Sequence, residues 1–167
     1  MYNNCMKKIY YTWSDVESQT HEILRQISLS DWRPDYVVGL TRGGLVPANL
    51  ISQYLEVPME TLKVSLRDDV EKEHNFWMAE HAAEGKNILI VDDINDTGAT
   101  LKWIEQDWQD SVASADWPKI WNSNVRIAVL IDNESSRYHT IDYSAVDINK
   151  AVEDSWIVFP WEDWWKK

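Results

Sequence analysis

Apolar residues recur along the chain at two different periods, one typical of helices and the other typical of strands. Val16, Ile23, Leu24 and Ile27 follow one another at helical spacing. The runs "DYVVGL" and "VRIAVLID" are almost continuously apolar, as in strands that are buried on both faces of a parallel sheet. The pattern predicts helices over 14–29, from Pro47 to Leu55 and from Gly98 onward, and strands over 35–40, 60–66, 87–92 and 125–132.

Two local signals indicate where predicted helices begin. "SDVE" has the form of a capping box, in which Ser14 accepts from first-turn amides and Glu17 reaches back to the cap. Pro47 occupies a position that the first turn of a helix tolerates, because the amide hydrogen that proline lacks has no partner there. We therefore expect the first helix to start at Ser14 and the second near Pro47.

The alternation of strands and helices predicts an α/β protein with a mostly parallel sheet and right-handed crossovers. The chain has 167 residues and 44% hydrophobic content, enough for one sizeable core, so we expect a single domain over 1–167. The stretch 67–85 is charged and aperiodic, which indicates a long mobile loop, carrying at most a weak helix, that could act as a lid.

Composition restricts the class of partner. With 16 Lys and Arg against 28 Asp and Glu, the net charge is −12, which disfavours binding to nucleic acids or membrane surfaces because both are polyanions. The single cysteine, Cys5, leaves no disulfide framework, and no apolar stretch is long enough for a membrane span or a signal sequence. We expect a cytoplasmic protein. Most of the 11 tryptophans are expected in the core or at subunit contacts, among them Trp103, Trp108, Trp117 and Trp121.

Candidate chemistry is concentrated in "NILIVDDINDTGATL", residues 87–101. In open α/β sheets, ligands bind beyond the carboxyl ends of the strands, and Asp92 and Asp93 lie at such an end. The amides that follow could hold a phosphate at a helix N-terminus, where small residues let the ligand approach the backbone. Carboxylates beside a phosphate site suit ligand hydroxyls or a divalent cation. The predicted phosphate-binding residues are Asp96, Thr97, Gly98, Ala99 and Thr100.

Two other interpretations of this stretch deserve comparison. Its acids could merely cap the following helix, which explains one carboxylate but not three. A nucleotide-binding loop of the Walker type is excluded, because no Gly-Lys-Ser/Thr follows a strand anywhere in the chain.

The same residues carry a resemblance to a known family. "ILIVDDINDTGATL" is similar to the phosphoribosyl-pyrophosphate (PRPP) signature of type I phosphoribosyltransferases, and "VVGLTRGGLVPANL" resembles their pyrophosphate loop. "DYSAVDI" with "DSWIVFPWE" resembles the C-terminus of bacterial xanthine-guanine phosphoribosyltransferases. The resemblance covers about residues 10–162 and implies a mostly parallel sheet flanked by helices, a mobile loop, and a small C-terminal hood over 142–167.

The resemblance also implies roles for individual residues. Asp92 and Asp93 would hold the ribose hydroxyls, directly or through Mg²⁺, and the loop that follows would bind the 5-phosphate. Arg42 would contact pyrophosphate with its guanidinium, and the peptide bond Thr41-Arg42 is expected to be cis. The pyrophosphate loop would comprise Thr41, Arg42, Gly43 and Gly44.

The base subsite is where the sequence departs from the family. Asp96 would share the proton of purine N7, and Trp156 and Ile157 would stack on the base and read its edge. Relatives that act on 6-oxopurines usually place a lysine against O6 just after the preceding strand, whereas this chain has "IDNESSR" there. Asn133 is the expected occupant, or Asp132 if the register slips by one residue.

The implied reaction is transfer of phosphoribosyl from PRPP to a purine, giving a nucleoside monophosphate and pyrophosphate. A 6-oxopurine (guanine, xanthine or hypoxanthine) is the favoured acceptor, in nucleotide salvage. The alternatives are a modified base or a pyrimidine as acceptor, and a regulator of the same fold that binds PRPP or nucleotide without catalysis. The resemblance also suggests a homodimer or a homotetramer.

Overall fold

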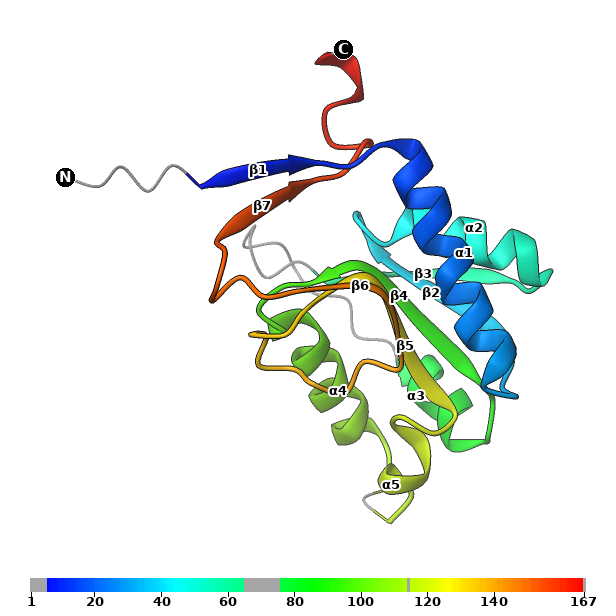
Figure 1. The fold of residues 1–167 in the computed structure, drawn as a ribbon. Helices are drawn as coiled ribbons and strands as arrows, with labels where there is room; N and C mark the ends of the chain where they lie inside the picture. The colour runs from blue at the N-terminus through cyan, green and yellow to red at the C-terminus, as the bar shows by residue number, and fades with distance from the viewer. Residues whose placement is uncertain (1–5, 65–75, 114, 167) are drawn as a thin grey trace.

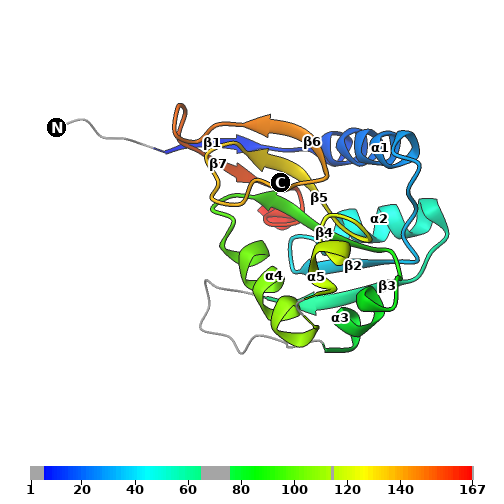
Figure 2. The same ribbon diagram turned by 90° about the horizontal axis from the view of Figure 1, so that it is seen from below.

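The computed structural model describes residues 6–64, 76–113 and 115–166. Five parallel strands form a central sheet in the order β3-β2-β4-β5-β6, which Figure 2 shows from one edge of the molecule to the other. Their bounds are β2 Tyr36–Thr41, β3 Met59–Lys63, β4 Ile88–Asn95, β5 Val125–Asn133 and β6 Tyr143–Ile148. The predicted parallel α/β architecture is confirmed.

Helices cover both faces of this sheet (Figure 1). One face packs on α1 (Trp13–Leu29) and α2 (Leu45–Leu55), and the other packs on α3 (Phe76–Ala83), α4 (Ala99–Ser111) and α5 (Trp117–Ile120). The apolar runs of β2, β4 and β5 are buried between the two layers, as their continuous hydrophobicity predicts.

The order of strands reverses between β2 and β4. From β2 the chain crosses to β3 on one side, and it then returns to place β4 on the other side of β2. Such a switch point leaves a crevice outside the carboxyl ends of the two strands, where open α/β sheets bind ligands. Here those ends are Thr41 and Asn95, so both sequence motifs reach the same crevice.

The first helix starts earlier than the sequence predicts. Thr12, not Ser14, is the cap: its Oγ1 accepts from the Asp15 amide at 3.1 Å, and Asp15 Oδ2 accepts from the Thr12 amide at 2.7 Å. The prediction of a capping box was right in kind but wrong by two residues, because Thr12 and Asp15 satisfy the same spacing as Ser14 and Glu17.

The expected mobile loop over 67–85 is only partly within the described residues. Residues 67–75 lie outside them. The remainder contains α3, whose Met78, Ala79 and Ala82 are almost fully buried in the core. The prediction of a mobile loop is therefore wrong for 76–83, where the weak helix that the sequence suggested is present.

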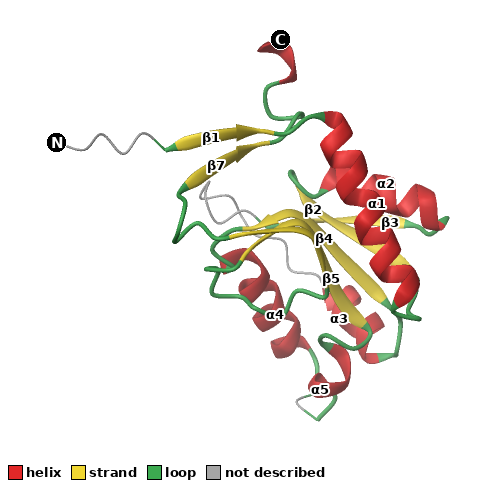
Figure 3. Cartoon of the chain, in the orientation of Figure 1, coloured by secondary structure: helices red, strands yellow, loops and turns green. Residues whose placement is uncertain are grey.

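A second, smaller sheet pairs the two ends of the chain. Strand β1 (Lys7–Tyr10), which the sequence did not predict, lies parallel to β7 (Ser155–Val158). Figure 3 shows this pair separate from the main sheet, with the short helix η1 (Trp164–Lys166) beyond it. The predicted hood over 142–167 is thus too wide, because β6 belongs to the main sheet; the hood is formed by β1 with the segment after Ile148.

The tryptophans near α4 confirm the expected core role. Trp108 and Trp121 are buried and meet edge to face at 5.9 Å, while Trp117 stacks on Trp121 at 5.3 Å. Trp121 Nε1 donates to Tyr138 Oη at 2.7 Å, so the indole nitrogen is satisfied inside the core. Trp103 packs against the same cluster. Among the helices of the described residues, none is long and apolar enough to cross a membrane.

Candidate active site between the two sheets

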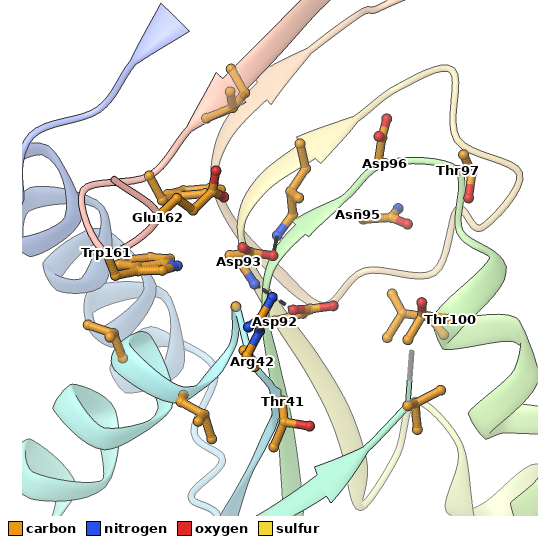
Figure 4. Close-up of a pocket in the computed structure, with 18 of the residues that line it drawn as sticks. Thr41, Arg42, Asp92, Asp93, Asn95, Asp96, Thr97, Thr100, Trp161 and Glu162 are labelled. Atoms are coloured by element: carbon orange, nitrogen blue, oxygen red, sulfur yellow. Dashed lines mark hydrogen bonds between the residues drawn. The ribbon is translucent and has the colours of Figure 1, made fainter. Parts of the chain in front are cut away.

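A pocket of about 1150 Å³ lies between the carboxyl edge of the main sheet and the small β1–β7 sheet. Its walls come from the ends of β2 and β4, from the loop into α4, and from the segment that follows β6. Figure 4 shows Arg42, Asp92 and Asp93 near one another at the strand ends, with Trp161 and Glu162 facing them from the C-terminal segment. Of the predicted site residues, the pocket is lined by Thr41, Arg42, Gly43, Asp92, Asp93, Asp96, Thr97, Gly98, Ala99, Thr100, Trp156 and Ile157.

The turn after β2 carries the predicted pyrophosphate loop. The Thr41-Arg42 peptide bond is cis, as expected. A Cβ on Gly43 would lie 2.2 Å from Asp93 Oδ2, and one on Gly44 would lie 2.3 Å from the Val91 carbonyl oxygen. Position 44 therefore requires glycine, because a Cβ there would meet backbone, and a Cβ at position 43 would displace the Asp93 carboxylate. The loop thus packs directly against the end of β4. This contact joins the two motifs into one site.

The acid pair at the end of β4 is held by its own backbone. Asp92 Oδ1 accepts from the Asp93 amide at 2.9 Å, and Asp93 Oδ1 accepts from the Ile94 amide at 2.8 Å. Each bond occupies one carboxylate oxygen and fixes the side chain at the pocket wall. The two carboxylates thus present negative charge to a ligand in the pocket. Packing of the hydrophobic core does not explain why two acids stand at this strand end.

The loop into α4 is fixed from outside the site. Gly98 caps the helix with φ of 84°, and a Cβ there would lie 2.5 Å from Tyr138 Cβ. The Thr97 carbonyl accepts from the Arg137 amide at 3.0 Å. The N-terminus of α4 thus faces the pocket without a side-chain cap, a geometry suited to an anion.

A buried polar network beneath this loop was not predicted. Asn95, only 2% exposed, donates to Asp132 Oδ1 at 2.8 Å and to the Tyr138 carbonyl at 2.9 Å, and it accepts from Ser136 Oγ at 3.0 Å. Burial raises the pKa of the Asp132 carboxyl, which the Asn95 bond partly opposes. Asp132 therefore braces the loop and does not line the pocket.

Asn133 does not face the base subsite, so its predicted contact with O6 is wrong. It is 5% exposed and does not line the pocket. Its Nδ2 donates to the Asp96 carbonyl at 2.9 Å, and its Oδ1 accepts from the Lys150 amide at 3.0 Å and from Ser135 Oγ at 2.9 Å. The short side chain thus joins the backbone of Asp96 to that of Lys150 and also accepts from the Ser135 hydroxyl.

A lysine does reach the pocket, from a different element. Lys150 lies between β6 and β7, and its Nζ is 3.0 Å from Asp96 Oδ1 and 5.7 Å from the centroid of the Trp156 ring. The sequence pattern points to the segment after β5, where relatives carry the lysine, and Lys150 lies outside that segment. The available signal was that Lys150 is the only lysine between Lys119 and Lys166.

The hood supplies further residues that sequence reasoning missed. Trp161, Glu162 and Trp165 line the pocket, and Trp161 stacks on Phe159 at 4.8 Å with nearly parallel rings. Ile157 is buried on β7, whereas Trp156 is 36% exposed. Because side chains alternate along a strand, the side chains of Trp156 and Ile157 point to opposite faces of the small sheet.

Comparisons with known proteins agree with this geometry. A model of the phosphoribosyl transferase domain matches residues 7–163. The chain is 32% identical to a xanthine-guanine phosphoribosyltransferase of Cereibacter sphaeroides over 136 residues, which are 78% of this chain and 70% of that protein. It is 24% identical to a xanthine-guanine phosphoribosyltransferase of Idiomarina loihiensis, with 93% of this chain and 88% of that protein aligned.

Among solved structures, a purine phosphoribosyltransferase from Pyrococcus horikoshii superimposes with a TM-score of 0.69 at 25% identity, covering 95% of this chain and 96% of the other. The parallel sheet, with a pocket at its switch point lined by a glycine loop and an acid pair, places the chain in the class of open α/β proteins that bind ligands beyond the carboxyl ends of their strands. Within that class, the chain belongs to the phosphoribosyl transferase domain family.

Proposed function

We propose that this protein transfers the 5-phosphoribosyl group from PRPP to a purine base and releases pyrophosphate. One observation carries the proposal: the glycine loop after β2 packs on the acid pair of β4, and both line a pocket that Trp156 closes from the hood. The names of the relatives support a purine acceptor, since those proteins act on xanthine and guanine.

The strand ends suit the three parts of PRPP. The Thr41–Gly44 turn offers amides and the Arg42 guanidinium to pyrophosphate. Asp92 and Asp93 accept from the ribose hydroxyls, which donate well to carboxylates. The amides and hydroxyls over 96–100 receive the 5-phosphate at the start of α4, where the helix dipole favours an anion.

The base stacks on the exposed ring of Trp156 and presents its N7 to Asp96. In the reaction, base N9 forms a bond to C1 of the ribose, while the bond from C1 to the pyrophosphate oxygen breaks and its electron pair leaves with pyrophosphate. The proton on N7 passes to the Asp96 carboxylate. Positive charge develops on the ribose ring, and the nearby acid pair stabilises that charge.

The acid pair also fits a magnesium ion. Mg²⁺ is usually held through one or two carboxylates together with substrate phosphates, not by an all-protein cage. Oδ1 of Asp92 and Oδ1 of Asp93 each accept from a backbone amide, and both residues lie beside the turn proposed for pyrophosphate. Among the described residues no group of three or more His, Cys, Asp or Glu side chains could hold a metal. In the proposed complex the phosphates of PRPP supply further ligands. When bound, Mg²⁺ supplies charge neutralisation of the departing pyrophosphate.

Pyrophosphate release tests the proposal. The protein is incubated with PRPP and Mg²⁺, and with guanine, hypoxanthine, xanthine, adenine or orotate in turn. We expect release that depends on a purine and on Mg²⁺. A regulator of the same fold binds PRPP or nucleotide in calorimetry but gives no base-dependent release, and that result overturns the proposal.

The proposal also covers the oligomeric state of the protein and its location in the cell, and the resemblance to the family supports both. We propose a homodimer or homotetramer in the cytoplasm, and the exposed aromatic residues Tyr10, Trp13, Trp164 and Trp165 are available for contacts between copies. Light scattering coupled to size-exclusion chromatography measures the molar mass, and a monomer at micromolar concentration contradicts the assembly.

A further inference from the structure

We propose that Lys150, from the segment between β6 and β7, is the residue that selects 6-oxopurines over 6-aminopurines. Lys150 would contact O6 of the base, the role that relatives give to a lysine at the end of the preceding strand, where this chain has Asn133. The inference rests on the proposed function, since it assigns the specificity of the same pocket. Four features of the described residues carry it.

The first is the pairing of Lys150 with Asp96. The two side chains come from distant parts of the chain, and Nζ lies 3.0 Å from Oδ1 with 15% and 21% of the side chains exposed. Both line the pocket. The pair therefore presents one strong donor and one strong acceptor, side by side, at a largely dehydrated wall where such groups discriminate between ligands.

The second is the position of this pair relative to the aromatic shelf. Lys150 Nζ lies over the Trp156 ring at 5.7 Å from its centroid. The ammonium and the ring therefore adjoin one another in the pocket that both line. In the proposed complex, a base that stacks on Trp156 turns its edge toward Lys150 and Asp96.

The third is the chemistry of that edge. A 6-oxopurine carries the O6 acceptor next to N7 on one edge, whereas adenine carries an amino donor at the corresponding place. Lys150 has donors only, so it satisfies O6 and opposes an amino group. Asp96 accepts the N7 proton beside it. The spacing of the ion pair matches two neighbouring ligand atoms that have opposite requirements.

The fourth is that Asn133 holds both partners by their backbones. It donates to the Asp96 carbonyl at 2.9 Å and accepts from the Lys150 amide at 3.0 Å. The residue at the position of the usual lysine thus positions the ion pair without touching the ligand. Lys150 also belongs to the same segment of the hood as Trp156. One segment therefore supplies both the ring that stacks on the base and the donor that recognises its edge.

The test compares Lys150→Met with wild type and with Lys150→Arg. Lys86→Met is the matched control, because Lys86 is exposed at the opposite end of β4. For guanine and hypoxanthine we expect kcat/KM to fall at least tenfold in Lys150→Met, mainly through the KM of the base, since a hydrogen bond to a charged group is lost. The KM of PRPP should stay within about twofold, and the rate with adenine should rise, because the donor that opposes its amino group is removed. Lys150→Arg should restore most of the loss with guanine and hypoxanthine.

Binding of GMP, AMP and ribose 5-phosphate, measured by calorimetry, separates this inference from the proposed function. If wild type shows no turnover, phosphoribosyl transfer fails, but a preference for GMP over AMP that Lys150→Met removes still supports the role of Lys150. The inference is overturned if Lys150→Met leaves the guanine kinetics unchanged. It is also overturned if wild type binds GMP and AMP alike, or if the substitution weakens ribose 5-phosphate as much as GMP.

Discussion

Asn133 illustrates how a side chain can occupy an expected position without the expected role. A lysine at that place could extend toward the base, but the shorter asparagine turns its carboxamide inward, where three backbone or hydroxyl partners satisfy it. Burial to 5% exposure makes those bonds costly to lose. Introducing a lysine there would remove the bonds and bury a charge, so Asn133→Lys is not expected to improve base binding.

Asn133→Ala tests this positioning role. The substitution leaves the Asp96 carbonyl and the Lys150 amide without this partner, so we expect the free energy of unfolding to fall by about 1–3 kcal/mol. The KM of the base should rise while the KM of PRPP changes little. Ser135→Ala, which removes only an exposed hydroxyl bonded to Asn133, is the control and should change neither quantity. Unchanged base kinetics in a destabilised Asn133→Ala protein would leave Asn133 a purely structural residue.

The acid pair makes a separate prediction at the same scale. Asn keeps the oxygen that accepts the Asp93 and Ile94 amides, so the double substitution Asp92→Asn with Asp93→Asn should leave the melting temperature nearly unchanged. We expect turnover to fall by about 100-fold or more, because the charge that stabilises the ribose and attracts a cation is lost. Asp110→Asn, on the exposed face of α4, is the control. Retained activity in the folded double variant rejects the ribose-binding assignment.

Consecutive residues were predictable and distant partners were not. Asp92 to Thr100 form one motif at one strand end, so their types and spacing sufficed to place them in a site. The partner of Asp96 is 54 positions further along the chain (150 − 96), in a segment without periodicity. No local pattern specifies such a contact, because it depends on how β6 and β7 direct the chain.

At the scale of elements, long apolar strands were predictable and short edge strands were not. The four residues of β1 carry two lysines, and the strand exists because β7 offers a parallel partner 148 positions away (155 − 7). Similarly, β6 is half-buried at the edge of the main sheet, so its pattern is neither continuous nor alternating. The short edge strands form because a partner strand is available, whereas the central strands can be recognised from the strand propensity of their own residues.

Asp142, which lies just before β6 and contacts β5, should make the stability of the folded protein depend on pH. Asp142 Oδ2 accepts from the Ile127 amide at 2.8 Å, and burial nevertheless raises the pKa of this carboxyl above its ordinary value. A pKa that is higher in the folded state means that the stability contribution of the protonated form is present at low pH and is lost as the pH rises through the folded pKa. The ionised carboxylate therefore costs stability near neutral pH.

Asp142→Asn should remove that cost, since its amide oxygen can still accept from Ile127. We expect a higher melting temperature than wild type at pH 7, and a difference that disappears as the pH falls below about 4, the ordinary pKa of aspartate. Thermal unfolding followed by circular dichroism across this range measures it. Asp110→Asn serves again as the exposed control. A variant that is less stable at every pH would mean that the charge of Asp142, beside Arg126, is favourable in the fold.

At the scale of the whole molecule, the pocket is shared between two sheets with different tasks. The five-stranded sheet carries the glycine loop, the acid pair and the start of α4, all of which suit PRPP. The small sheet carries Trp156, which suits the base, and its strands β1 and β7 lie near the two ends of the chain. Base binding and PRPP binding should therefore respond separately to substitutions in the two sheets.

Trp156→Ala tests this division, with Trp164→Ala as its matched control. Stacking of a base on an aromatic ring is worth about 1–3 kcal/mol, so the KM of the purine should rise about 5- to 150-fold in Trp156→Ala. The KM of PRPP should change by less than about twofold, because no part of PRPP is assigned to the small sheet. Trp164 is 64% exposed and does not line the pocket, so its removal should leave both constants unchanged. Steady-state kinetics with each substrate varied in turn give both values. Equal losses for purine and PRPP in Trp156→Ala would show that the small sheet supports the whole pocket and that the two tasks are not divided between the sheets.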